Sequence, residues 1–196
     1  AVYIAFQKHL LPHSAARLVA KIFFWPTMPI TLLSRYNKLR SLIDETVILG
    51  VAPILPGYPK ELYDMGVRGV VNLCDEYAGP KKAYKELGMK HHYIPTVDHT
   101  EPSVSDLRSA VEFIDTIRKA NGKVYIHCKA GHGRSAAVVL AWLASQNPSA
   151  ELKDLQMLIS AARRVRKTLY LQPGVIKFHA GLGESTAKDT DNARKN

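Results

Sequence analysis

The feature that most constrains the fold is the segment 123–145, KVYIHCKAGHGRSAAVVLAWLAS, in which two apolar stretches flank a polar loop. Residues 123–127 are predicted as a short buried strand, and 135–145 as an apolar core helix. The loop between them holds Gly131 and Gly133. A buried strand that leads straight into such a helix is typical of a sheet covered by helices, so the sequence predicts an α/β fold.

The same alternation of short apolar strands and helical periods starts at Thr46. Ser103 and Asp106 form a capping-box-like start for one of the helices. Further strands are predicted at 47–50, 69–73 and 91–95, and further helices at 59–66, 81–88, 103 to about 120, about 150–164 and near 173–179.

We expect three regions along the 196 residues. Residues 1–39 form an N-terminal basic and apolar segment, residues 40–180 form one folded domain, and residues 181–196 form a polar tail predicted to be disordered. The formal charge is +10, and residues 1–43 hold six basic residues and no acidic one. This asymmetry indicates a targeting segment, a membrane-surface segment or an anionic partner.

The N-terminal run SAARLVAKIFFW (14–25) predicts a helix that Pro26 and Pro29 stop or kink. Its apolar stretch is shorter than the ~20 residues that a membrane span requires, and Arg17 and Lys21 interrupt it. Two interpretations stay open, a helix that lies on a membrane surface and a helix packed on the domain. The composition also fits a partly processed mitochondrial presequence.

The chain has two cysteines, Cys74 and Cys128, which is too few for a disulfide framework and shows no metal-ligand spacing. We therefore expect no metal and no cofactor. Cys74 lies in the apolar run VVNLC and is predicted to be a small buried side chain. The sequence contains no finger, basic zipper or RNA-sheet signature, so nucleic acid is not an expected partner.

Cys128 opens the glycine-bearing loop, and Arg134 closes it. In such a strand-to-helix loop the backbone N–H groups point inward and form an anion site at the start of a helix. The Arg134 fork binds two phosphoryl oxygens, and its charge favours the Cys128 thiolate. The predicted substrate-binding residues of the loop are Lys129, Ala130, Gly131, His132 and Gly133.

Thiolate attack on phosphorus gives a cysteinyl-phosphate without any metal, and the leaving alcohol then needs a proton. Asp98, in the loop PTVDHTEPS, is the predicted general acid, whereas Asp106 and Asp115 are weaker candidates because they fall on a helix. Ser135 is predicted to donate a hydrogen bond to the cysteine sulfur and ease its departure. The predicted reaction is metal-independent phosphomonoester hydrolysis.

The loop HCKAGHGRS with Asp98 ahead of it resembles the dual-specificity branch of the protein tyrosine phosphatase superfamily. A closer resemblance, to the mitochondrial phosphatidylglycerophosphatase subfamily, rests on LVAKIFFWPTMPITLLSR, DETVILGVAP, VRGVVNLCDEY, LGMKHHYIPTVDHTEPS, VYIHCKAGHGRSA and QPGVIKFH, which keep their order. It implies the dual-specificity phosphatase fold with a central, mostly parallel sheet flanked by helices. It also implies that Glu76 and Tyr77 lie near the active site and bind substrate.

The resemblance further implies a phosphorylated anionic lipid, phosphatidylglycerophosphate, as substrate in cardiolipin synthesis. It implies a peripheral location on the matrix face of the mitochondrial inner membrane. Alternatives are a dual-specificity phosphoprotein phosphatase, a phosphoinositide phosphatase, and a pseudophosphatase that binds phosphorylated ligands without turnover. Arg163, Arg164, Arg166 and Lys167 are either an anionic-lipid contact or a solvated helix end. The oligomeric state stays open.

Overall fold

The structure, a computed structural model, describes Phe6 and residues 10–193. Its centre is a five-stranded sheet of order β1-β2-β5-β3-β4, in which β1 is antiparallel to β2 and every other pair is parallel. The predicted α/β class with a mostly parallel sheet is confirmed. The strands are β1 (Arg40–Leu42), β2 (Val47–Gly50), β3 (Val67–Cys74), β4 (Lys90–Thr96) and β5 (Lys123–His127).

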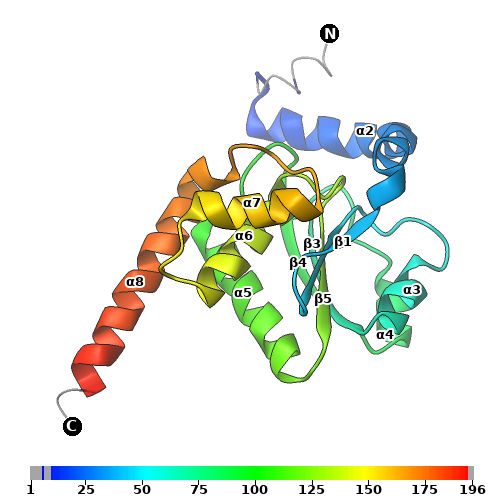
Figure 1. The fold of residues 1–196 in the computed structure, drawn as a ribbon. Coiled ribbons are helices and arrows are strands. Elements are labelled where there is room, and N and C mark those ends of the chain that lie inside the picture. The colour runs from blue at the N-terminus through cyan, green and yellow to red at the C-terminus, as the bar shows by residue number, and fades with distance from the viewer. Residues whose placement is uncertain (1–5, 7–9, 194–196) are drawn as a thin grey trace.

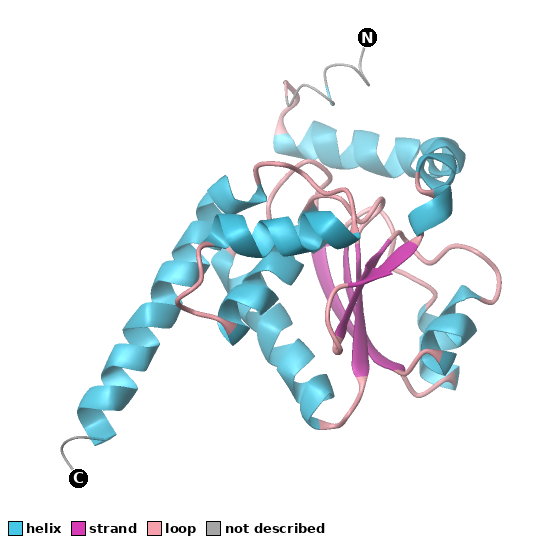
Figure 2. Ribbon diagram, in the orientation of Figure 1, coloured by secondary structure: helices cyan, strands magenta, loops and turns pink. Residues whose placement is uncertain are grey.

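Helices cover both faces of the sheet (Figures 1 and 2). On one face α5 and α6 lie against the strands, and α7 and α8 pack outside them. On the other face lie the short helices α3 and α4. The bounds are α3 (Tyr58–Asp64), α4 (Lys81–Glu86), α5 (Val104–Lys119), α6 (Arg134–Gln146), α7 (Leu152–Ala162) and α8 (Pro173–Ala193), with 3₁₀ turns η1 (Tyr36–Lys38) and η2 (Leu169–Leu171).

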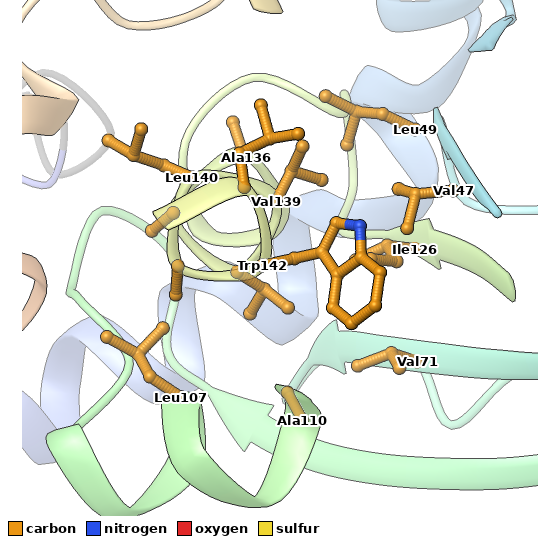
Figure 3. Packing of buried hydrophobic residues seen from close by; sticks show 14 of the residues in the cluster. Val47, Leu49, Val71, Leu107, Ala110, Ile126, Ala136, Val139, Leu140 and Trp142 are labelled. Carbon is orange, nitrogen blue, oxygen red and sulfur yellow. The ribbon is translucent and has the colours of Figure 1, made fainter. Parts of the chain in front are cut away.

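The main core lies between the sheet and α6, which is buried from Arg134 to Ala144. Figure 3 shows Trp142 of this helix packed among side chains from the strands and α5. The indole N–H of Trp142 donates to Asp44 Oδ2 at 2.7 Å, so this large ring is buried without losing its hydrogen bond. Because α6 is fixed along its whole length, the loop at its start is held on a rigid base.

Local sequence signals place most elements within a few residues of their predicted positions. The Ser103–Asp106 capping box is present at the start of α5, and Cys74 is buried. Two elements differ. The three-residue strand β1 was not predicted, because it is too short to show an alternating pattern. Helix α8 continues to Ala193, through most of the segment predicted as a disordered tail. Extending an existing helix needs no new nucleus, which is why a polar segment can follow it. Residues 194–196 lie outside the described residues.

The N-terminal helix α2 (His13–Ser34) crosses the sheet at the carboxyl ends of the parallel strands and bends partway along (Figure 1). Pro26 and Pro29 lie inside it, so they bend the helix and do not stop it. Because the helix continues to Ser34, the apolar stretch is longer than the sequence suggested. Its segment Ser14–Ser34 is long and apolar enough, by length and composition, to cross a membrane.

One face of α2 packs on the domain. Phe24 and Met28 are buried, and Arg17 makes a two-pronged ion pair with Asp75 at 2.6 and 2.8 Å. The opposite face exposes large apolar side chains, among them Leu18, Ile22, Trp25, Ile30 and Leu33. Both faces of this helix are therefore adapted to apolar surroundings, and the described part of the chain leaves the outer one largely uncovered.

Candidate active site

The glycine-bearing loop runs from the end of β5 to the start of α6, at the edge of the sheet where ligands bind in parallel α/β folds. Gly131 has φ +62°, and a Cβ there would lie 2.5 Å from the backbone oxygen of Gly50. Only glycine fits that position. Gly133 has a negative φ and open space where a Cβ would stand, so this second glycine is not sterically required.

Arg163, after α7, supports the loop from below. Its guanidinium donates to the carbonyl oxygens of Gly131 and Ala130, each at 2.9 Å, and to that of Lys38. Because these carbonyls turn toward Arg163, the neighbouring N–H groups are free to face the other side of the loop. Arg163 is fully buried. The sequence left two interpretations of Arg163 open, a lipid contact and a solvated residue, and its burial contradicts both.

Cys128 lies at the bottom of the loop and is 3% exposed. Ser135 Oγ donates to its Sγ at 3.2 Å, which is the placement that the predicted role of Ser135 requires. Burial raises the pKa of the Cys128 thiol, but Arg134, Ser135 and the amide of His132 outweigh it and hold that pKa below its usual value. Burial raises the pKa of Cys74 well above its usual range, so only Cys128 is set up as a thiolate.

His127, just before Cys128, is buried and neutral. Burial lowers its pKa to about 3, and its Nδ1 lies 3.4 Å from the carbonyl oxygen of Cys128. A histidine with so low a pKa is not protonated near neutral pH and stays a neutral part of the loop's support.

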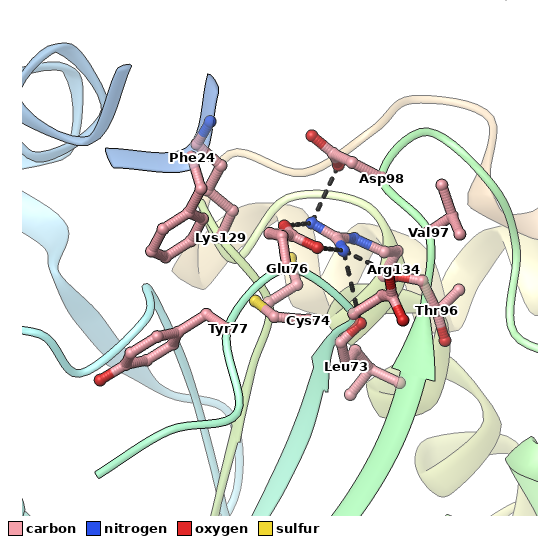
Figure 4. A network of polar contacts seen from close by, with 12 residues as sticks. Phe24, Leu73, Cys74, Glu76, Tyr77, Thr96, Val97, Asp98, Lys129 and Arg134 are labelled. Carbon is pink, nitrogen blue, oxygen red and sulfur yellow. Dashed lines mark hydrogen bonds and ion pairs between the residues drawn. The ribbon is translucent and has the colours of Figure 1, made fainter. Parts of the chain in front are cut away.

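Arg134 is held by a network of acceptors (Figure 4). Glu76 accepts from Nη1 at 2.8 Å and from Nη2 at 2.7 Å, and the Thr96 carbonyl accepts from Nη1 at 2.8 Å. Asp98 lies 2.9 Å from Nη2. Both side chains of the Arg134–Glu76 pair are almost fully buried. Among the described residues no hydrogen bond uses Nε, so the Nε–Nη2 edge of the fork faces the site.

Asp98 follows β4 and faces the same site as Arg134 and Cys128. Burial favours its neutral form, but the charges of Arg134, His99 and Lys129 hold the pKa of the Asp98 carboxyl below its usual value. The weaker candidates lie elsewhere: Asp106 caps α5, and Asp115 pairs with Arg118 and Lys119.

A pocket of about 210 Å³ lies over this loop. Four of the predicted substrate-binding residues are partly exposed and line it, namely Lys129, Ala130, His132 and Gly133, whereas Gly131 is buried beneath it. Lys129 donates to Thr27 of α2 and lies 5.7 Å from the Phe24 ring. The lining residues are Thr31, Asp98, His99, Thr100, Cys128, Lys129, Ala130, His132, Gly133, Arg134 and Arg166.

Glu76 and Tyr77, for which the resemblance implied substrate binding, do not line the pocket. Glu76 contacts Arg134, and the Tyr77 ring stacks on Phe24 with centroids 5.2 Å apart. The geometry therefore assigns both residues to the support of the site. Asp75, the residue before them, is the partner of Arg17.

Sequence reasoning missed the contribution of α2 to the pocket. Thr31 lines it, and Arg35, just after the helix, reaches His132 Nδ1 at 3.0 Å. These residues lie about a hundred positions before the loop, and no short motif connects them to it. The one sequence feature that pointed to a role of this segment in anion binding was the absence of acidic residues around Arg35.

The converging groups suit phosphate chemistry: a buried low-pKa thiol, a guanidinium fork, a carboxyl and a loop of N–H groups. Among the residues that the structure describes, no group of His, Cys, Asp or Glu is arranged to hold a metal ion. The positive charge and the N–H groups that a phosphoryl group needs are supplied by Arg134 and the loop.

Residues 47–175 match the family model of the dual specificity phosphatase catalytic domain. The phosphatidylglycerophosphatase and protein-tyrosine phosphatase 1 of Homo sapiens is 28% identical over 87% of this chain and 91% of its own length. The phosphatidylglycerophosphate phosphatase PTPMT2 of Arabidopsis thaliana is 34% identical over 85% of this chain and 77% of its own.

The solved structures agree with these relatives. The crystal structure of PTPMT1 superposes with a TM-score of 0.68 at 30% identity, over 76% of this chain and 99% of that one. A second crystal structure shows PTPMT1 in complex with PI(5)P, with a TM-score of 0.68 at 26% identity over the same share of this chain.

Proposed function

The chain belongs to the dual-specificity phosphatase family and is a cysteine-dependent phosphatase, and from this premise we propose that it hydrolyses phosphatidylglycerophosphate to phosphatidylglycerol. Two kinds of support lead to a lipid substrate. Relatives named for this activity align over most of the chain, and a neighbouring fold holds a phosphoinositide in its crystal structure.

The observation that carries the proposal is the position of α2. This helix contributes Thr31 to the pocket wall while its far side exposes Leu18, Ile22 and Leu33. A pocket beside an apolar helix face receives a headgroup directly from a membrane surface, where the acyl chains stay in the lipid.

In the proposed mechanism the scissile phosphate replaces Asp98 on the Nε–Nη2 edge of Arg134, while the loop amides bind its other oxygens. The Cys128 thiolate attacks phosphorus, and the glycerol oxygen leaves with a proton from Asp98. A cysteinyl-phosphate forms and free glycerol hydroxyl is released.

In the second step Asp98, now a carboxylate, takes a proton from water as that water attacks the cysteinyl-phosphate. The sulfur leaves as a thiolate, which accepts the hydrogen bond of Ser135. Inorganic phosphate is released, and Asp98 is again protonated for the next cycle.

The decisive experiment is phosphate release from phosphatidylglycerophosphate in mixed micelles, with the Cys128→Ser variant as control. We expect turnover well above the control and a higher kcat/KM than on a phosphotyrosine peptide. Turnover on the peptide alone would establish a phosphoprotein phosphatase. Trapped phosphoenzyme without turnover on either would establish the pseudophosphatase.

We also propose that α2 holds the protein on a membrane, which would be the matrix face of the mitochondrial inner membrane. Removing α2 is a poor test because the helix lines the pocket. The sharper test is Ile22→Glu with Leu33→Glu, which should abolish sedimentation with vesicles that contain anionic lipid. Met157→Glu, at an exposed apolar residue of α7, is the matched control. Equal vesicle binding by both variants would contradict this role of α2.

A further inference from the structure

Three arginines surround His132 at the mouth of the pocket. Arg35 donates from Nη2 to His132 Nδ1 at 3.0 Å and from Nη1 to the Arg164 carbonyl oxygen at 3.0 Å. Arg166 lines the pocket, and its backbone N–H donates to the His132 carbonyl oxygen at 2.9 Å. The end of α2, the nucleophile loop and the segment after α7 therefore meet at this point.

This arginine cluster, Arg35, Arg164 and Arg166, has no carboxylate partner among the described residues. Arg17 and Arg118, by contrast, are each paired with a carboxylate, that of Asp75 and that of Asp115. Arg35 is half-buried, and burial together with the nearby charge of Arg164 lowers its pKa. Like charges gathered in a partly desolvated place are unfavourable unless an anion binds there.

The His132 ring is neutral in this arrangement. Burial lowers the pKa of His132, the hydrogen bond with the Arg164 carbonyl raises it, and the charges of the neighbouring arginines lower it again, so the net shift is downward. A guanidinium only donates, so Nδ1 accepts from Arg35 when the ring proton is on Nε2. The Arg164 carbonyl oxygen lies 3.3 Å from the same Nδ1 and is its partner in the other tautomer. His132 thus holds Arg35 in position at the loop without neutralising it.

We propose that Arg35 and Arg166 form a second anion subsite, which binds a second phosphate of the substrate while the scissile phosphate lies on the Cys128 loop. The inference rests on the proposed function: in phosphatidylglycerophosphate that second group is the phosphodiester, one glycerol unit from the scissile phosphate. Arg35 lies outside the matched domain 47–175, so the N-terminal segment itself contributes to substrate choice.

The variants Arg35→Gln and Arg166→Gln test the subsite. The control is Arg118→Gln, which removes an arginine from α5, far from the pocket. The substrates are para-nitrophenyl phosphate, phosphatidylglycerophosphate in micelles, and its deacylated, water-soluble headgroup. A lost charge-assisted hydrogen bond corresponds to about tenfold or more in affinity. We therefore expect KM for both two-phosphate substrates to rise about tenfold more than KM for para-nitrophenyl phosphate, whereas Arg118→Gln shows no such difference.

Equal losses on one-phosphate and two-phosphate substrates would overturn the subsite, because the arginines would then only support the loop. A selective loss confined to the micellar substrate would also overturn it and assign the cluster to the membrane surface.

A second measurement separates the subsite from the proposed function. Inhibition of para-nitrophenyl phosphate hydrolysis by the deacylated headgroup is compared with inhibition by glycerol 3-phosphate. If the wild type prefers the headgroup and Arg35→Gln loses this preference, the subsite is supported even when phosphatidylglycerophosphate is not turned over. If the wild type shows no preference for the headgroup, the subsite is refuted even when phosphatidylglycerophosphate is turned over.

Discussion

Replacing Glu76 by glutamine tests how Arg134, the proposed ligand of the scissile phosphate, is held. The Glu76 side chain is 1% exposed and that of Arg134 is 2% exposed, and two hydrogen bonds of 2.7 and 2.8 Å join them. Removing one charge of a buried pair costs about 3–5 kcal/mol. Because glutamine keeps the shape of the side chain and one acceptor, we expect the free energy of unfolding to fall by the lower end of this range, about 3 kcal/mol.

For a chain of this length about 1 kcal/mol corresponds to about 2–4 °C in melting temperature, so Glu76→Gln should lower the Tm by about 6–12 °C. Arg134 also loses its fixed orientation, and we expect kcat/KM for phosphate esters to fall about 100-fold. Thermal unfolding followed by circular dichroism measures the first effect, and initial rates of phosphate release measure the second.

The matched control is Glu86→Gln, which removes an exposed carboxylate that lies 3.9 Å from Lys82. It should leave both the Tm and kcat/KM close to those of the wild type. A Glu76→Gln variant with wild-type kcat/KM would refute the assignment of Glu76 as the support of Arg134. This would hold even if its Tm had fallen.

Four further outcomes follow from the structure. Asp98→Asn should reduce kcat on alkyl phosphates about 100-fold or more and much less on para-nitrophenyl phosphate, whose leaving group needs no proton. Because the reaction needs Cys128 as a thiolate and Asp98 as an acid, the kcat/KM profile of the wild type should be bell-shaped, and the lowered pKa values of both groups move the bell to lower pH than unperturbed groups would give. Activity rises as the thiol ionises and falls as the acid loses its proton, so Asp98→Asn should lose the alkaline limb, and an unchanged limb would exclude this acid. Arg134→Ala should raise the pKa of Cys128, which the pH dependence of iodoacetate alkylation measures, and an unshifted profile would show that the guanidinium does not lower that pKa. Arg17→Ala should loosen α2 from Asp75 and increase protease cleavage near Pro26, a result that Lys153→Ala on α7 should not reproduce.

Local patterns predicted the part of the site that is continuous in sequence. The strand 123–127, the loop and the helix from Arg134 follow one another, and the residues that shape them are neighbours in the chain. Asp98 was also identified, because the mechanism needs an acid in a loop after a strand. The structure brings it to 2.9 Å from Arg134, although its role as an acid stays a prediction.

Contacts between distant segments were out of reach of such patterns. The pairing of Arg17 with Asp75 and the approach of Arg35 to His132 depend on where α2 docks, and periodicity does not specify docking. The basic run 163–167 shows the same limit. In sequence its arginines look alike, whereas in the fold Arg163 is buried under the loop and Arg166 faces the pocket.

Hydrolysis through a cysteinyl-phosphate on Cys128 is tested most directly by trapping the covalent intermediate during turnover of phosphatidylglycerophosphate labelled in its terminal phosphate. The reaction is quenched in acid within the first turnovers, and the labelled peptide is identified by mass spectrometry. We expect label on Cys128 in the wild type and none in Cys128→Ser. Phosphate release at the wild-type rate from Cys128→Ser, or label on any other residue, would contradict this mechanism.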